Sequence, residues 1–148
     1  MVRRQLKVPT GVKAKLKNAR VARLATVDEK CRPHVVPICF VYARGVFYSA
    51  VDRKPKRVPA EKLARLRHIK KMPEVTLLVD EYQENWGRLW YILVRGKARL
   101  IPKSARKERA AAVRQLRAKY IQYAAGMLAD DAPVIRITPE RISSWGRL

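Results

Sequence analysis

The chain has 148 residues, of which 48% are hydrophobic, and this is ordinary for one globular domain of common size. Its apolar runs are far shorter than the roughly 20 residues that span a membrane, and no secretion signal is recognised, so we expect a cytoplasmic protein without a membrane segment. Lys and Arg number 34 against 12 acids; the net charge of +22 favours a polyanionic partner, whether nucleic acid, an anionic membrane surface or a charged small molecule.

The first half of the chain predicts a helix, three strands and a second helix. Apolar spacing indicates the first helix over Thr10–Arg20 and the second over Ala60–Lys71. Between them, apolar segments separated by short polar turns indicate strands at Val21–Val27, Arg32–Tyr42 and Val46–Val51. We therefore expect these three strands to form a continuous antiparallel meander.

The second predicted strand contains Pro33 and Pro37, which have no amide hydrogen to donate. An edge or bulged position is therefore expected for it. Cys31 and Cys39 are too far apart for a C-x-x-C motif, and we expect both to be reduced.

The second half of the chain predicts further strands around one more helix. The expected elements are strands at Glu74–Asp80 and Leu89–Leu100, a basic helix capped by Ser104 and running to about Tyr120, a loop at Gly126–Ala132, and strands at Pro133–Thr138 and Arg141–Trp145. This order favours an antiparallel barrel with helices over its openings, as one domain spanning residues 1–148. No Gly-rich nucleotide-binding fingerprint is recognised.

The segment Asp52–Arg57 is the clearest candidate for a binding site. An apolar strand ends there in four cations within five positions. Such cations can form charge-assisted hydrogen bonds with a phosphate, and two or three of them would anchor a nucleotide. A solvated basic loop explains the same residues, and charge alone does not separate the two interpretations.

Other polar residues provide little support for side-chain catalysis or a metal site. His34 and His68 have no matching partner group and are expected to be non-catalytic. Adjacent acids at residues 80–81 and 130–131 lack a His or Cys cluster, so we expect no metal, and the catalytic residues stay unknown.

Several segments, in this order and spacing, resemble the flavin-binding split-barrel family of pyridoxamine 5′-phosphate oxidase-like proteins. They are Ala22–Val27, Pro33–Pro37, Phe47–Val51 and Lys54–Arg57. The chain is most similar to the branch of deazaflavin (coenzyme F420)-dependent enzymes, through Asp52–Arg57, Leu77–Asp80 and Trp86–Trp90. The resemblance covers roughly Ala19 to Leu100.

The resemblance implies a mainly β (α+β) fold, an antiparallel split β-barrel with flanking helices, and a homodimer with two cofactor clefts at the subunit interface. It places the isoalloxazine ring against Pro37, Ile38, Tyr48, Ser49, Ala50 and Val51. It assigns the cofactor phosphate to Lys54, Lys56 and Arg57. Trp86 and Trp90 would lie near the cleft or the dimer interface, although a buried core position is the commoner place for a strand tryptophan.

By the same resemblance the protein is an FMN- or F420-dependent oxidoreductase acting on a small organic molecule. A flavin supplies the hydride chemistry, so an obvious side-chain acid or base is not required. Vitamin B6 oxidases continue into a C-terminal segment that grips the substrate phosphate, whereas this sequence stops at Leu148, so we expect another substrate.

We favour F420 as the cofactor, with FMN as the alternative. F420 carries a phosphodiester and an acidic oligoglutamate tail, which need a longer positive track than the single phosphate of FMN. Lys62, Arg65 and Arg67 follow the phosphate-binding segment and would extend such a track.

Two alternatives to a redox enzyme stay open at this stage. A nucleic-acid-binding protein would explain the basic segments Arg3–Arg23, Arg65–Lys71 and Lys103–Lys119, but no base-reading motif accompanies them, so we expect at most weak, non-specific binding. A flavin-binding protein without turnover shares every motif of the enzyme. The apolar run Leu89–Val94 favours a dimer independently of the resemblance, because a monomer of this size would expose much apolar surface there.

Overall fold

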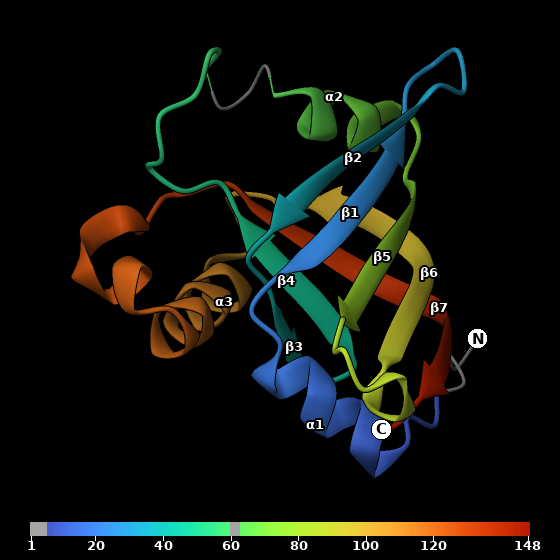
Figure 1. Ribbon diagram of the computed structural model, residues 1–148. Helices are drawn as coiled ribbons and strands as arrows, with labels where there is room; N and C mark the ends of the chain where they lie inside the picture. Colours follow the sequence, from blue (N-terminus) through green and yellow to red (C-terminus); the bar gives the residue numbers. More distant parts are fainter. Residues whose placement is uncertain (1–5, 60–62) are drawn as a thin grey trace.

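A computed structural model of the chain describes residues 6–59 and 63–148. Its strands form one curled antiparallel sheet in the order β2-β1-β5-β6-β7-β4-β3 (Figure 1). Their bounds are Ala22–Val27 (β1), Pro33–Ile38 (β2), Val41–Ala43 (β3), Val46–Ala50 (β4), Glu74–Glu81 (β5), Trp90–Leu100 (β6) and Val134–Gly146 (β7). This sheet confirms the expected α+β split barrel, and the two prolines of β2 do lie on an edge strand.

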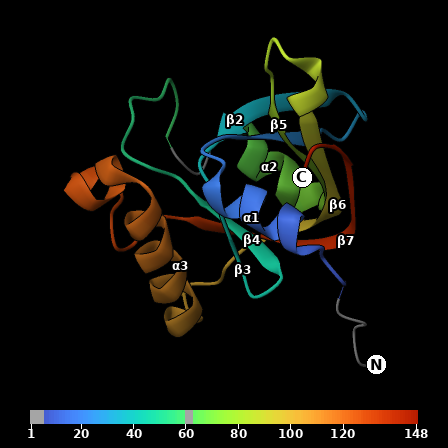
Figure 2. The ribbon, with the colours of Figure 1, turned by 60° about the horizontal axis from the view of Figure 1, so that its bottom comes forward.

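Three helices flank the sheet: α1 (Thr10–Asn18), α2 (Ala64–Lys71) and α3 (Arg106–Lys119). The first two lie at opposite ends of the barrel, and Figure 2 shows α1 across one end with α3 standing to the side. A short 3₁₀ turn, η2 (Trp86–Arg88), precedes β6, and a π turn, η3 (Tyr123–Met127), follows α3. In the described residues, no helix is long and apolar enough to cross a membrane.

Two hydrophobic clusters hold these layers together. The barrel interior contains Phe40 and Phe47, and it is closed by Leu16 from α1 and Leu66 from α2. Outside the barrel, α3 packs Leu116 and its neighbours against the strands to form a second cluster. The helices are therefore anchored by their apolar faces, which leaves most of their cations toward solvent.

The predicted strand Arg32–Tyr42 and the continuous meander are corrected by the structure. The segment is split into β2, which pairs with β1, and β3, which pairs with β4 at the opposite edge of the sheet. Between them the backbone amide of Phe40 donates to the hydroxyl of Tyr120, 2.9 Å away, instead of to a neighbouring strand. Tyr120, the residue that follows α3, thus accepts the hydrogen bond that a neighbouring strand would otherwise accept, at the point where the chain passes from one edge of the sheet to the other.

Smaller differences concern the ends of elements. The two predicted closing strands are the single strand β7, whose pairing with β6 shifts register between Arg95 and Gly96. The basic helix α3 begins after Ala105 without a side-chain cap, so the predicted Ser104 cap is wrong. The start of the predicted second helix, at residues 60–62, lies outside the described residues, and Leu63 is still extended.

The apolar run Leu89–Val94 has a different role from the expected one. Strand alternation buries Trp90, Ile92 and Val94 in the barrel, so most of the run belongs to the core. Tyr91 points outward and stacks on Trp145, with ring centroids 5.8 Å apart. The run therefore does not form the exposed apolar surface on which the dimer argument was based.

Replacing Gly96 by Ala should destabilise the barrel. A Cβ atom there would lie 2.2 Å from the carbonyl oxygen of Thr138, a backbone atom that cannot move aside as a side chain can. We expect the free energy of unfolding to fall by about 1–3 kcal/mol in urea denaturation. The neighbouring exposed change Lys97→Ala serves as control, and an equal, small effect of both variants would contradict this account of the close strand approach.

Candidate functional site

A cleft of about 350 Å³ opens where β2 and β4 end. We call it the β4 cleft. Six residues that the sequence predicted for cofactor binding line it, namely Pro37, Ile38, Ser49, Ala50, Lys54 and Lys56. The prolyl, isoleucyl and alanyl side chains give an apolar wall on the strand side, and the lysines lie in the loop after β4. Apolar and cationic groups therefore share one cleft.

The other five predicted residues lie elsewhere in this chain. The hydroxyl of Tyr48 donates to Glu108 of α3 at 3.0 Å, and Val51 is part of the barrel core. Arg57 and Trp86 are exposed and do not line the cleft, and Trp90 is buried with its indole N–H donating to a carboxylate on β5. Their contact with a cofactor stays a prediction.

Asp52 organises the cationic side of the β4 cleft. Its side chain is 7% exposed, forms an ion pair with the ammonium of Lys54, and accepts a 2.7 Å hydrogen bond from Tyr123 of η3. The ammonium of Lys56 lies 3.3 Å from the same carboxylate. Burial pushes the pKa of Asp52 upward, but the hydrogen bonds from Lys54 and Tyr123 outweigh it and lower the pKa to about 2. The carboxylate is therefore ionised at neutral pH.

The loop itself is closed by backbone and lysine contacts. The ammonium of Lys56 donates to the carbonyl oxygens of Asp52 and Lys54, at 2.5 and 2.7 Å. The amide of Arg53 donates to the carbonyl of Met127 at 2.9 Å, which joins the loop to η3. These contacts position Lys54 and Lys56 at the rim before any ligand arrives.

Arg65, near the start of α2, also lines the β4 cleft and carries an unmet hydrogen-bonding group. Its Nε atom is buried and has no hydrogen-bond partner among the described residues. Burial lowers the pKa of this guanidinium, and the nearby charge of Asp52 acts in the opposite direction. A buried donor without an acceptor is costly, so this part of the cleft favours an anionic acceptor.

A mostly apolar hollow of about 650 Å³ adjoins the cleft and shares Cys39, Lys54 and Tyr123 with it. Ile121 and Met127 also line it, from the segment after α3. The arrangement offers a charged site for an anion beside an apolar space for an organic molecule.

Sequence reasoning missed several residues of this site. Asp52 belongs to the motif that was singled out, but only the cations were assigned a role, although an acid among four cations was a visible signal. Tyr123 and Cys39 come from segments that reach the cleft only because η3 folds back and the chain changes sheet edges. Nothing local in the sequence indicates those approaches.

The acid stability of the protein should report on Asp52. The carboxyl has a pKa near 3.8 when unfolded and about 2 when folded, so its contribution is present above about pH 4 and is lost as the pH falls toward 2. The free energy of unfolding is measured in urea at a series of pH values. For Asp52→Asn it should be about 1–2 kcal/mol lower than for wild type near neutral pH, and it should fall less than that of wild type as the pH is lowered. The control is Asp130→Asn at an exposed carboxyl; identical acid dependence of wild type and Asp52→Asn would refute the assignment.

Comparison with known structures places this architecture among several split barrels. The heme storage protein HutZ of Vibrio cholerae is 14% identical, with 95% of each chain covered and a TM-score of 0.71. An FAD-binding protein of Mesorhizobium loti is 22% identical (93% of this chain, 94% of that chain, TM-score 0.67). A structure titled F420 reductase is 23% identical (92% and 98%, TM-score 0.65). At these identities the likeness establishes the fold alone.

The sequence comparisons give one family. No curated protein matches the chain significantly. The family described as pyridoxamine 5′-phosphate oxidase matches residues 9–146, which is nearly the whole chain. The match agrees with the curled seven-stranded sheet and with the segments that carried the resemblance. The chain belongs to the pyridoxamine 5′-phosphate oxidase family of split-barrel proteins.

Proposed function

We propose that the β4 cleft binds a flavin-type cofactor and that the protein is an oxidoreductase. The observation that carries this proposal is the buried, unpartnered Nε of Arg65 in a cleft that also contains Lys54 and Lys56. Three cations lie around one carboxylate there, so a phosphate would complete the charge balance and accept from Nε of Arg65 and from the ammonium of Lys54, while Lys56 contributes its charge. The residues present therefore fit the phosphate-bearing chain of such a cofactor.

The chain's own residues would bind and orient the cofactor. Arg65, Lys54 and Lys56 would hold the phosphate, while Pro37 and Ile38 provide the apolar wall that the ring requires. A flavin-type group, when bound, supplies hydride transfer to or from an organic substrate. The adjoining apolar hollow, with Ile121 and Met127, would receive that substrate and keep water from it.

F420 is the favoured cofactor and FMN is the alternative. Of the three cations expected to extend the positive track, Arg65 lines the β4 cleft, where it would serve the phosphate that both cofactors carry. Arg67 lines a different hollow on another side of α2, and Lys62 lies outside the described residues. The preference for F420 therefore depends on the resemblance to the F420-dependent branch and is decided by titration.

Cofactor titration tests this assignment. FMN and F420 are titrated separately into wild type, Arg65→Gln and Arg114→Gln, the last being an exposed arginine of α3 that removes the same charge. A charge-assisted hydrogen bond contributes about 1.5–3 kcal/mol, so Arg65→Gln should weaken the preferred cofactor roughly 10- to 100-fold while the control stays near wild type.

The same titration includes haemin, because HutZ is a heme storage protein with this fold. His34 and His68, the two histidines of the chain, do not line the β4 cleft. Tight haemin binding with no affinity for FMN or F420 would overturn the proposal. If the cofactor binds but no organic substrate oxidises or reduces it, the protein binds a cofactor without turnover, and the proposed oxidoreductase activity is wrong.

The proposal includes a homodimer, because the family resemblance puts the cofactor between two subunits. Large apolar side chains stay exposed in the single chain, including Ile121 at 85%, Trp86 at 71% and Trp145 at 53%. Burying such groups against a second copy would remove apolar area from water. Light scattering should therefore give about twice the 17.1 kDa chain mass at micromolar concentration. A monomer would contradict this part of the proposal.

A further inference from the structure

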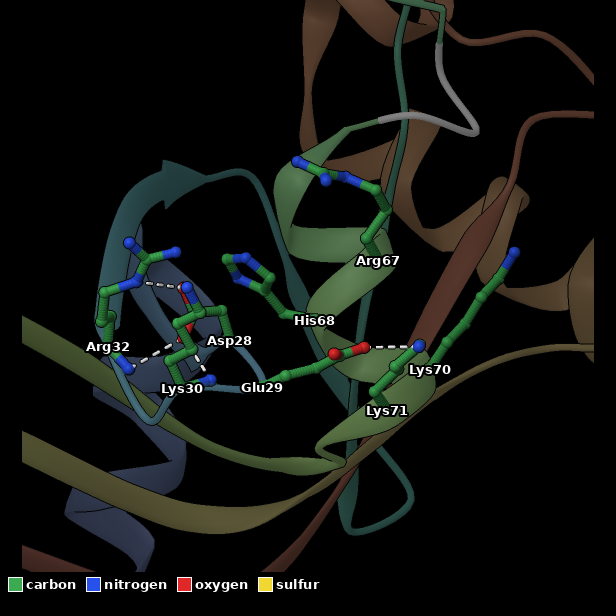
Figure 3. Close-up of a pocket in the computed structure, with 8 residues that line it drawn as sticks. All are labelled: Asp28, Glu29, Lys30, Arg32, Arg67, His68, Lys70 and Lys71. Carbon is green, nitrogen blue, oxygen red and sulfur yellow. Dashed lines mark hydrogen bonds and ion pairs between the residues drawn. The ribbon is translucent and has the colours of Figure 1, made fainter.

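A second hollow, of about 590 Å³, lies on another side of α2 from the β4 cleft. The turn between β1 and β2 forms one wall, and the second half of α2 forms the other (Figure 3). Five cationic side chains and two carboxylates line it, which leaves an excess of three positive charges. We call it the His68 pocket, after the histidine in its lining.

Both carboxylates of the His68 pocket are already used within the protein. Asp28 accepts hydrogen bonds from the backbone amides of Lys30 and Arg32, each 2.9 Å away, and from Nε of Arg32 at 2.6 Å. Glu29 forms an ion pair with Lys71 of α2. The acids therefore shape the turn and tie it to the helix, and Lys30, Arg67 and Lys70 have no counterion among the described residues.

Arg32 and Arg67 line the pocket from its two walls, the first on the turn and the second on α2. Figure 3 shows the ring of His68 between their guanidinium groups, with Lys70 pointing away from them. Arg32 uses Nε to bind Asp28, so its terminal nitrogens stay available. The side chain of Arg67 makes no hydrogen bond or ion pair within the described residues. Guanidinium groups on two walls of one hollow are donors suited to the oxygens of a tetrahedral dianion.

His68 is held in place between them. Its Nδ1 lies 2.8 Å from the hydroxyl of Thr26 on β1, and its ring meets that of His34 on β2 edge to face, with centroids 5.3 Å apart. This leaves Nε2 as the ring nitrogen that can donate to a ligand when the ring is protonated.

We propose that the His68 pocket binds a compact phosphate-type dianion of a small molecule, held between Arg32 and Arg67 with His68 beneath it. This site is distinct from the cofactor cleft and does not depend on the proposed redox function. A small anion fits better than a nucleic-acid backbone, because the cations line one hollow of about 590 Å³ instead of following an extended track.

The site should be sensitive to pH through His68. Burial, His34, Arg67 and Arg32 lower the pKa of His68, while Asp28 raises it. The imidazole is therefore mainly neutral at neutral pH, and a bound dianion would favour the imidazolium. By linkage, affinity for the dianion rises as the pH falls through the titration of His68.

The experiment uses sulfate and pyrophosphate as probes at constant ionic strength, followed by two-dimensional NMR of the amides of residues 28–32 and α2. Wild type should show saturable shifts there. Arg32→Gln combined with Arg67→Gln should weaken binding at least tenfold, while the exposed pair Arg99→Gln with Arg114→Gln, which removes the same charge, should not. Because Arg32→Gln also loosens the turn, Arg67→Gln alone is a second test and should weaken binding as well.

Sulfate stays a dianion across the titration range of histidine, so its pH dependence reports on the protein. Affinity should be higher at about pH 5.5 than at about pH 8 in wild type and flat in His68→Gln. Equal weakening in the pocket and control variants, or wild-type affinity that ignores pH, would overturn the proposal. Saturable binding of an oligothymidylate at these residues, without binding of sulfate or pyrophosphate, would assign the pocket to nucleic acid and reject the small anion.

Discussion

The candidate site depends on the ion pairs and hydrogen bonds that the carboxylate of Asp52 makes. It binds Lys54, Lys56 and Tyr123 together, and so joins the end of β4 to the segment that follows α3. Without that negative charge, two lysines and the guanidinium of Arg65 would repel one another around the cleft. With it, the cations keep a net positive charge in a fixed arrangement. Binding a dianion then needs little reorganisation.

The few acids of this basic chain hold cations in position at several points. Asp28 orders the turn between β1 and β2 and fixes Arg32, just as Asp52 orders the loop after β4. Glu108 of α3 accepts hydrogen bonds from Tyr48 and Arg136 and so ties the outer helix to the sheet. Since successive helix positions rotate by about 100°, Arg65 and Arg67 face different sides of α2. One short helix thus contributes a cation to the β4 cleft and another to the His68 pocket.

Much of the fold could be predicted because strand alternation and turn residues are local signals. The apolar periods of β5 and β6 predicted both strands closely, and the ordered motifs predicted the family. The split of the second predicted strand could not be predicted, because it depends on Tyr120, a residue 80 positions away, bonding the amide of Phe40. Likewise, the cationic loop was recognisable, but the approach of Tyr123 depends on the fold-back of η3, where Gly126 has a φ of 109°.

The prediction that the run Leu89–Val94 forms an exposed apolar surface was wrong for a related reason. An unbroken apolar run does not reveal which of its members face the core, and here the alternation gives Trp90, Ile92 and Val94 to the barrel. The exposed aromatic pair Tyr91 and Trp145 forms only when β7 pairs with β6. Long-range strand pairing therefore determines which side chains of this run are buried and which are exposed, and the local sequence pattern could not predict it.

A crystal structure of the protein with FMN or F420 bound would show directly whether the β4 cleft holds the cofactor. The cofactor phosphate should contact Arg65 and the lysines after β4, with the ring against Pro37 and Ile38. A cofactor that leaves Nε of Arg65 without an acceptor, or one whose phosphate occupies only the His68 pocket, would rule out the β4 cleft as the cofactor site.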